Sequence, residues 1–291
     1  VRGFKVAIAS TNRRKYSETF IHSHYSLLEE NDLLLTDGYL PGAVSYNAGK
    51  TFQKLQPTFL ERIFRKKVDP HILLMRLLKK QKIKVLLAEY GPAGVELWPV
   101  CKKLGIQLVV HFHGYDAYRN DVLNSYGVHY KALFDYASHL IVVSKDMQKQ
   151  LLRLGAPSKK VKLNPYGVDV DFFKPISVAR KPNTLVFCGR FVPKKAPHKL
   201  VRVFELIKQR IPEASFTMIG DGELLESTKK LAEELGLEDS IVFTGVLSRV
   251  EVRKRLEKAE VYIQHSEKTF ENDSEGTPLS ILEAMAMNLP V

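Results

Sequence analysis

The sequence predicts an α/β protein with two domains, each built on a parallel sheet. Short apolar runs typical of buried strands alternate with helical segments along the chain, which is the pattern of doubly wound sheets. The chain has 291 residues, enough for two domains of ordinary size. A segment rich in proline and glycine separates the halves. We therefore predict one domain over residues 1–165, a linker over 166–182 and a second domain over 183–291.

Composition and cysteine content are those of an ordinary globular protein. The chain is 45% hydrophobic and 26% charged, and it has no apolar run of the about 18 residues that a membrane-spanning helix needs. Nothing near Val1 resembles a signal peptide. Cys101 and Cys188 lie far apart in apolar segments, which favours buried thiols and a reducing cytoplasm. Because the chain starts without Met and stops at Val291 in what reads as a new strand, we expect a fragment cut at both ends.

The net charge of +12 is concentrated in the first half. Residues 1–181 hold 29 Lys and Arg against 15 Asp and Glu, a net of +14, whereas residues 182–291 hold 15 against 17, a net of −2. A strongly basic half favours an anionic partner such as nucleic acid, an anionic membrane or a phosphorylated acceptor. Solvated basic helix faces are the alternative.

The first half alternates strands and helices in the order of a doubly wound domain. Residues 37–47, rich in glycine, tyrosine and proline, read as a loop. Strands are expected at 4–9, 33–36, 84–89, 106–112 and 140–144, and helices at 17–30, 94–104, 127–138 and 145–154.

Residues 50–82 form a tract in which apolar and basic side chains alternate. This composition is typical of an amphipathic element that lies on an anionic membrane. Two helices with apolar faces toward the core and basic faces toward solvent explain it equally. The apolar members are Phe52, Phe59, Ile63, Phe64, Ile72, Leu73, Leu77 and Leu78.

Two histidines end the strand predicted at 106–112. His111 and His113 are two residues apart on an extended segment, so they can share one side of it. A metal pair needs further ligands, and no cysteine or third histidine stands nearby in the sequence. Because ligands bind at the carboxyl ends of strands in open α/β sheets, we favour His113 as a polar active-site group over a turn residue.

The second half repeats the alternation. The segments Gly189–Lys195 and Gly220–Gly222 follow predicted strands and read as loops. Strands are expected at 184–188, 215–219, 241–244 and 261–265, and helices at 198–210, 224–235 and 250–258.

A last helix is predicted between residues 275 and 290. Thr277 suits the N-cap and Pro278 the first helical position. Asn288 can adopt the left-handed conformation after the last turn, and Pro290 prevents continuation. The apolar face is expected to comprise Leu279, Leu282 and Ala286.

The start of this helix predicts an anion site. Gly276 precedes backbone N–H groups at the positive end of a helix dipole, which suits a phosphate. Glu275 and Glu283 flank the site, and carboxylates there are suited to accepting hydrogen bonds from sugar hydroxyls. Phosphate and hydroxyls together indicate a sugar nucleotide.

Loops at neighbouring strand ends strengthen this interpretation. Arg190 and Lys195 could neutralise a diphosphate, because Arg makes forked contacts and Lys acts as a point charge. Gly220 and Gly222 would let backbone approach a ligand closely.

Together these segments resemble the family 4 retaining glycosyltransferases. Glu275 and Glu283, with seven residues between them, are similar to the family's E-x7-E motif. Residues 17–21 and 111–116 resemble the bacterial exopolysaccharide, colanic-acid-type branch. The other similar segments are Gly189-Arg190-x4-Lys195, Gly220-Asp221-Gly222, Phe243-Thr244-Gly245 and Tyr166-Gly167-Val168-Asp169.

The resemblance implies the GT-B fold, in which two Rossmann-like domains with parallel sheets face a cleft. The acceptor binds on the N-terminal side and the nucleotide sugar on the C-terminal side. Because the family continues through further strands and a last helix, we expect the C-terminal domain to be incomplete here. Ala196 and Asn288 stand where the family usually has Gly, so we expect at most a slight shift of the first loop.

The resemblance also implies the roles of individual residues. Glu283 would bind the ribose hydroxyls, while Glu275 and His113 are the catalytic candidates, with Glu275 on the transferred sugar and His113 reaching from the other domain. The donor-binding candidates are Arg190, Lys195, Gly220, Gly222, Gly276, Thr277, Pro278, Leu279 and Glu283.

The implied reaction is a retaining hexosyl transfer that needs no metal and no cofactor. The donor would be a UDP- or GDP-linked sugar, and the acceptor a saccharide or lipid-linked intermediate of exopolysaccharide or lipopolysaccharide biosynthesis. We expect a cytoplasmic protein with no nucleic acid partner, and Lys50–Lys84 as a segment that could dock on the inner membrane. The alternatives are a non-catalytic nucleotide-sugar-binding protein and a GT-B sugar-nucleotide epimerase.

Overall fold

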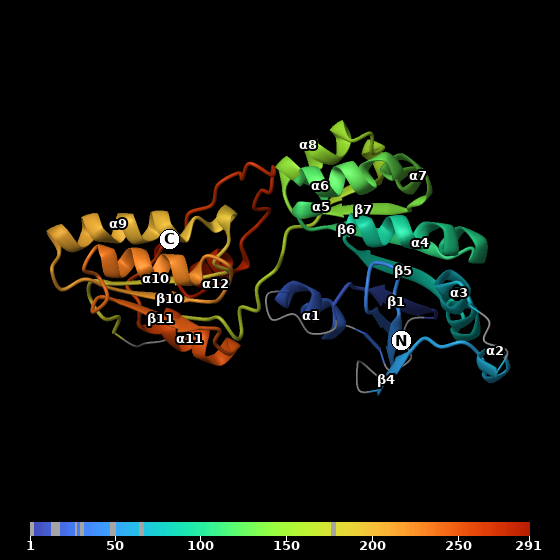
Figure 1. Cartoon of the computed structure of the whole chain (residues 1–291), viewed down its shortest axis with the longest axis horizontal. Helices are drawn as coiled ribbons and strands as arrows, with labels where there is room; N and C mark the ends of the chain where they lie inside the picture. Colours follow the sequence, from blue (N-terminus) through green and yellow to red (C-terminus); the bar gives the residue numbers. More distant parts are fainter. Residues whose placement is uncertain are drawn as a thin grey trace. The chain divides into compact units, whose positions relative to one another are not determined.

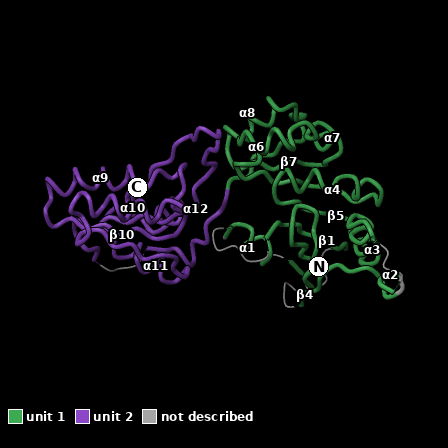
Figure 2. The backbone as a smooth tube through the Cα atoms, in the orientation of Figure 1, with its two compact units in different colours: residues 1–165 green, residues 166–291 purple. Residues whose placement is uncertain are grey.

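The computed structural model describes residues 3–12, 18–26, 28–29, 32–46, 51–63, 67–175 and 179–291. The chain divides into two compact units, residues 1–165 and 166–291 (Figure 2). The second unit includes the segment predicted as a linker, and a separate linker stays a prediction. No helix in the described residues is long and apolar enough to cross a membrane.

The first unit is built on an eight-stranded sheet with the order β4-β3-β2-β1-β5-β6-β7-β8 (Figure 1). Six neighbouring strands, in the order β2-β1-β5-β6-β7-β8, run parallel to one another. At the β2 edge of the sheet, β3 pairs antiparallel with β2, and β4 pairs antiparallel with β3. The strands are β1 Lys5–Ala9, β2 Leu33–Thr36, β3 Ala43–Tyr46, β4 Thr51–Lys54, β5 Ile83–Glu89, β6 Gln107–Phe112, β7 His139–Val142 and β8 Val161–Leu163.

The helices of this unit begin and end at residues with suitable chemistry. The Asp69 side chain accepts a hydrogen bond from the His71 N–H at the start of α3, and Lys82 ends α3 in the left-handed conformation. Ser144 caps α8 through the Met147 N–H. The helices are α1 Thr19–Ser26, α2 Phe59–Ile63, α3 Pro70–Gln81, α4 Gly91–Leu104, α5 Tyr115–Tyr118, α6 Asn120–Val122, α7 Val128–Tyr136 and α8 Lys145–Arg153, with a π-helical turn at Leu123–Gly127 and a 3₁₀ turn at Ser158–Lys160.

Two predictions in this unit were wrong. Residues 37–47 are not all loop, because β3 pairs antiparallel with β2 and β4. The turn-forming residues are confined to its start, where Asp37 and Gly38 have positive φ angles of 79° and 117°. The tract at 50–82 is not two helices only, because it begins with the exposed edge strand β4. The predicted helix 17–30 is described as α1, and parts of that prediction lie outside the described residues.

The second unit has a parallel four-stranded sheet with the order β11-β10-β9-β12. Alternate residues of β9 point to opposite faces, so Leu185 and Phe187 pack into one hydrophobic cluster and Val186 into the other. The strands are β9 Thr184–Cys188, β10 Ser215–Ile219, β11 Ile241–Gly245 and β12 Val261–Tyr262, and the helices are α9 Pro197–Arg210, α10 Leu225–Glu234, α11 Arg249–Lys258 and α12 Leu279–Ala286.

The predicted strand 261–265 is shorter in the structure. Only Val261 and Tyr262 form β12, although the Ile263 N–H still donates to the Val186 carbonyl at 2.9 Å. On its other side, the Tyr262 N–H donates to the Pro290 carbonyl at 2.8 Å. The end of the chain therefore runs beside β12.

Candidate functional site

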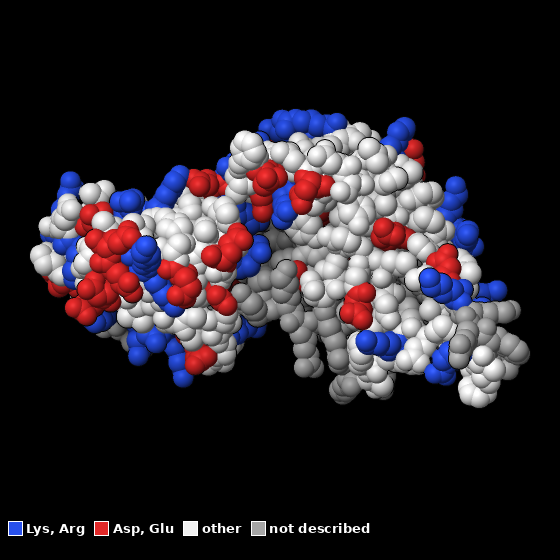
Figure 3. Space-filling view, viewed as in Figure 1, with Lys and Arg blue, Asp and Glu red and all other residues white. Residues whose placement is uncertain are grey.

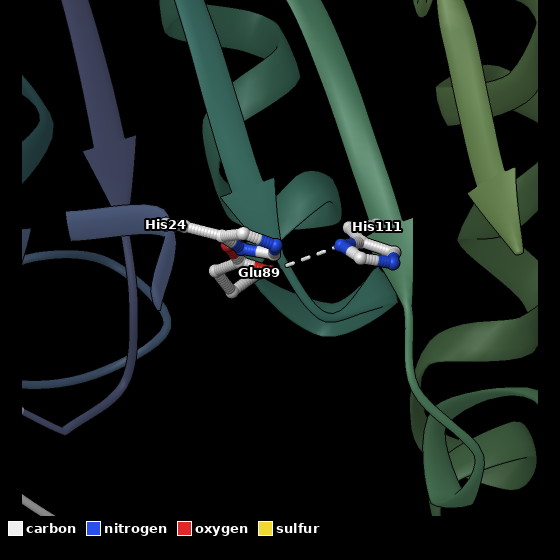
Figure 4. Close-up of side chains that lie close together, drawn as sticks. All are labelled: His24, Glu89 and His111. Carbon is white, nitrogen blue, oxygen red and sulfur yellow. Dashed lines mark hydrogen bonds and ion pairs between the residues drawn. The ribbon is translucent and has the colours of Figure 1, made fainter. Parts of the chain in front are cut away.

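The carboxyl ends of β5 and β6 hold a buried cluster of one carboxylate and three imidazoles. Glu89, the last residue of β5, has no exposed side-chain surface, and its Oε2 lies 2.7 Å from Nε2 of His113. Its Oε1 lies 2.7 Å from Nδ1 of His24 on α1. His111 Nδ1 lies 3.6 Å from Glu89 Oε2. Figure 4 shows Glu89 between His24 and His111.

Hydrogen bonds decide the charge of this cluster. Burial alone would raise the pKa of the Glu89 carboxyl, but the hydrogen bonds from His113 and His24, together with Coulombic attraction to the neighbouring imidazoles, lower that pKa to about 2. Burial also holds the pKa of His111 well below its usual value. The cluster is therefore an ionised carboxylate that shares its charge with at least two imidazole N–H groups.

The loop after β6 is fixed by a second buried acid. Asp116 accepts hydrogen bonds from the backbone N–H groups of Gly91, His113 and Gly114 at 2.9–3.0 Å. Burial still raises the pKa of the Asp116 carboxyl, against these bonds and the charge of His113. Asp116 thus joins the start of α4 to the loop that carries His113.

His24, Glu89 and His111 could also hold a metal ion, because their ligand atoms lie within 4.8 Å of one another. Sequence reasoning singled out His111 and His113 but missed Glu89 and His24. Glu89 could have been noticed as an acidic residue at the end of an apolar strand. His24 is 65 residues away from Glu89 on an ordinary helix, and no local signal marks it.

In the second unit, the loops that follow β9 and β10 are bonded to each other. The Phe191 N–H donates to the Asp221 carbonyl at 2.9 Å, and the Leu224 N–H donates to the Phe191 carbonyl at 3.0 Å. The predicted donor-binding residues Arg190, Gly220 and Gly222 lie in these two loops.

Gly220 and Gly222 are required because the backbones of these two loops lie so close together. Gly220 has φ +133°, and a Cβ atom there would lie 1.9 Å from the Gly189 carbonyl oxygen. Gly222 has φ +152°, and its Cβ would lie 2.5 Å from the Phe191 carbonyl oxygen. The Gly-x-Gly pattern therefore has a structural cause that is independent of any ligand.

The turn after β9 ends in a non-glycine residue with a left-handed backbone. This 3₁₀ turn, Pro193–Lys195, is followed by Ala196 in the left-handed conformation with φ +42°. A non-glycine residue in this region costs about 1–2 kcal/mol. Alanine at 196 therefore makes the turn less stable, while its backbone still adopts the left-handed form.

Ion pairs join this loop to residues 266–276. Lys195 Nζ lies 3.1 Å from Glu275 Oε2, and Lys194 Nζ lies 3.2 Å from Asp273 Oδ1. Lys199 pairs with Glu267. The structure thus brings together Lys195 and Glu275, which the resemblance assigned to the diphosphate and to the transferred sugar of the donor.

The Lys195 ammonium is held in a largely buried position. Burial lowers the pKa of Lys195, the Glu275 carboxylate opposes this shift, and the charges of Lys194 and Arg190 lower the pKa further. A buried cation beside a single carboxylate, with two other cations near it, is suited to receive additional negative charge.

The predicted cap of α12 was wrong. Pro278 precedes the helix with an extended backbone, φ −68° and ψ 113°, and no side chain caps it. The helix begins at Leu279. The predicted apolar face is only partly confirmed: Ala284 and Met287 are buried in the core, Ile281 and the predicted Ala286 pack against it, and Leu279 and Leu282 are not part of this cluster. Asn288 is left-handed as expected, with φ 54°.

Two groups link α12 to the sheet. The Tyr262 hydroxyl lies 2.8 Å from Ser280 Oγ and 3.1 Å from the Cys188 carbonyl, so it joins β12, α12 and the end of β9. Sequence reasoning missed this residue. Burial raises the pKa of the Glu283 carboxyl on the same helix, partly opposed by the charge of Arg249. Glu283 is therefore costly to keep ionised in this position.

Comparison with known families identifies the class of protein. The sequence matches the family described as Glycosyltransferase Family 4 over residues 34–172 and the one described as Glycosyl transferases group 1 over residues 169–291. Solved structures share the fold: Anabaena Alr3699/HepE in complex with UDP-glucose has a TM-score of 0.71 at 16% identity, over 99% of this chain and 79% of that one. The fold is that of the GT-B glycosyltransferases.

Both family models describe glycosyltransferases, and together they cover the chain from residue 34 to residue 291. The chain is 28% identical to the putative colanic acid biosynthesis glycosyltransferase WcaL of Escherichia coli K12. This alignment of 212 residues covers 71% of the present chain and 52% of WcaL. It is 27% identical over 212 residues to the amylovoran biosynthesis glycosyltransferase AmsK of Erwinia amylovora, with the same coverage. The chain thus spans about half the length of these relatives.

We expect Gly220→Ala to destabilise the second unit far more than Gly236→Ala. A Cβ at 220 would overlap a backbone carbonyl, whereas Gly236 has φ +66° and nothing within 4 Å of its Cβ position. The first change should cost at least about 3 kcal/mol and the second about 1 kcal/mol. Differential scanning calorimetry of both variants measures this, and equal losses of melting temperature would contradict it.

We expect Glu283→Gln to stabilise the protein at pH 7. The folded-state pKa of Glu283 is raised above 4.5, so the folded protein binds the proton more tightly than the unfolded chain, and stability falls as the pH rises through that pKa. The gain from glutamine, about 1.4 kcal/mol for each unit of pKa difference, should therefore vanish near pH 4. Melting curves at both pH values measure it. Glu234→Gln, on an exposed ion pair, is the control and should give no gain.

Proposed function

We propose that the chain is a retaining glycosyltransferase. It transfers a hexose from a UDP- or GDP-linked donor to a saccharide or lipid-linked acceptor of a surface polysaccharide, without a metal. The observation that carries this proposal is the family match that runs through both units, from residue 34 to residue 291. The relatives named for colanic acid and amylovoran biosynthesis support the polysaccharide acceptor.

The second unit offers groups suited to the donor. Lys195 and Arg190 lie in one loop and would neutralise the diphosphate, helped by the N–H groups at the start of α12. The diphosphate would compete with Glu275 for Lys195, which would release the Glu275 carboxylate toward the sugar hydroxyls. Glu283 would accept hydrogen bonds from the ribose, and these would offset the cost of its buried charge.

We also propose a cytoplasmic location with docking on an anionic membrane. The two helices among the described residues of the tract 50–84 present different surfaces. On α3, Leu74 and Leu78 are buried, so this helix faces the core, and Lys79 and Lys80 lie in its last turn. Figure 3 shows Lys and Arg spread over the surface, with Asp and Glu among them. On α2, in contrast, Phe59 and Ile63 are 69% and 55% exposed. The membrane contact is therefore assigned to α2, with the basic residues of α3 beside it.

The donor proposal predicts that UDP or GDP raises the melting temperature and that polyuridylate does not. At a concentration 100 times its Kd, a ligand adds about 2.7 kcal/mol of stability, a shift of several degrees. Lys195→Met and Arg190→Met should each abolish most of this shift, because they remove diphosphate contacts. Lys199→Met, which removes an exposed cation of the same region, should leave it intact.

Turnover of UDP-glucose, UDP-galactose or GDP-mannose, followed by release of the nucleotide, should be unchanged by EDTA. Stabilisation by polyuridylate alone would contradict the donor site. Loss of turnover in EDTA that added metal restores would contradict the metal-independent reaction.

The membrane proposal predicts that the chain floats with vesicles that contain about one-third phosphatidylglycerol and stays behind with pure phosphatidylcholine. Phe59→Ser combined with Ile63→Ser should weaken binding several-fold. Val128→Ser removes an equally exposed apolar side chain from α7 and is the matched control. Equal binding to both kinds of vesicle, or to neither, would refute the proposal.

A further inference from the structure

The three imidazoles around Glu89 differ in their exposure to solvent. Both carboxylate oxygens accept hydrogen bonds of 2.7 Å, one from His24 on α1 and the other from His113 after β6. The His24 side chain is 26% exposed, whereas the side chains of His111 and His113 are each 3% exposed. Of the three side chains, His24 is therefore the one that presents surface to a ligand, whereas His111 and His113 are enclosed.

The hydrogen bond to Glu89 determines which nitrogen of His24 is available for a ligand. Glu89 is ionised, so His24 Nδ1 must carry the proton in this bond. In a neutral imidazole the other nitrogen, Nε2, is then an acceptor. At His113 the same carboxylate binds Nε2 instead. The nitrogen of His24 that does not face Glu89 in this bond is thus Nε2, the one farthest from the backbone.

The position of His24 also suits a ligand. It lies on the helix that follows β1, beside the carboxyl end of β5, where Glu89 is located. Ligands of open parallel sheets bind outside the carboxyl ends of the strands. The Glu89 carboxylate fixes the ring there, as the buried aspartate of a catalytic triad fixes its histidine.

We propose that His24 is a saccharide-binding residue of the first unit and that Glu89 is its positioning residue. Nε2 of His24 accepts a hydrogen bond from a hydroxyl of the acceptor sugar, while Glu89 holds the ring and its tautomer. This assignment rests on the proposed glycosyltransferase function. It adds a contact with the acceptor sugar in the first unit, and His113 supports Glu89 through its own hydrogen bond to that carboxylate.

A metal ion would require a different arrangement of the same atoms. Two ligands at about 2.0–2.1 Å from a tetrahedral zinc ion lie roughly 3.3 Å apart. The contacts of Glu89 with His24 and His113 are 2.7 Å, which is the length of a charge-assisted hydrogen bond. The geometry therefore favours a shared proton over a shared metal, and metal content is measured in the test.

Nitrogen-15 NMR of the imidazoles tests the proposal without any need for turnover. The wild type should show His24 as the Nδ1–H tautomer, and Glu89→Gln should release this preference. The octyl glycosides of glucose, galactose and mannose serve as probes of the acceptor. At least one should shift the Nε2 signal of His24, and His24→Asn, which keeps a donor for Glu89, should bind it about fivefold more weakly, as expected for one hydrogen bond.

His71→Asn is the matched control. His71 Nδ1 also lies 3.0 Å from a carboxylate, that of Asp69, on the surface of the same unit. This change should leave glycoside binding intact. Neither His24→Asn nor Glu89→Gln should alter the melting shift produced by UDP or GDP. A wild type that shows no nucleotide shift would refute the proposed function itself, which separates that failure from a failure at His24.

Three results would overturn the inference. One is that no glycoside shifts the His24 signal. Another is that His24→Asn binds the glycosides as well as the wild type. The third is one equivalent of zinc per chain that is lost in Glu89→Gln, which would make the cluster a metal site.

Discussion

The structure depends at both candidate sites on charged groups that are removed from water. A buried carboxylate or ammonium is stable only when a partner supplies the lost hydration. Glu89 obtains this from two imidazole N–H groups on α1 and after β6, and Lys195 obtains it from Glu275. Each partner comes from a segment distant in sequence. The charges therefore hold α1 and the loop after β6 at the end of β5 in one unit, and residues 266–276 against the loop after β9 in the other.

Sequence patterns predicted the sheets well because buried strands leave a local signal. The strands β9 and β10 have the bounds that their apolar runs indicated. The failures occurred where tertiary contacts decide the outcome. β3 was missed because its neighbours supply its hydrogen bonds, while the turn residues before it suggested a loop. On α12, the apolar residues outnumber the core positions, so the pattern could not select Ile281 and Ala284 as the buried face.

The sequence indicated many of the individual residues of the candidate sites, but it did not indicate which of them contact one another. The resemblance to known glycosyltransferases indicated Arg190, Lys195, Glu275 and Glu283, but it could not show that Lys195 and Glu275 bind each other. The sequence analysis attributes the glycines of Gly-x-Gly to the close approach of a ligand. The structure shows an additional reason at Gly220, where a side chain would collide with the Gly189 carbonyl. His24 has no motif around it, and only its hydrogen bond with Glu89 brings it into the site.

The pairing of Lys195 with Glu275 has a consequence for donor binding. Both side chains are largely buried, so neither can be left alone without a large loss of stability. In the proposed donor site, a nucleotide sugar would supply both replacements at once, since its diphosphate would be an anion for Lys195 and its sugar hydroxyls would be donors for Glu275. A nucleoside diphosphate without the sugar would replace only one of them. This exchange would let the protein distinguish the donor from the spent nucleotide, and it requires that the lysine and the glutamate be bound to each other beforehand.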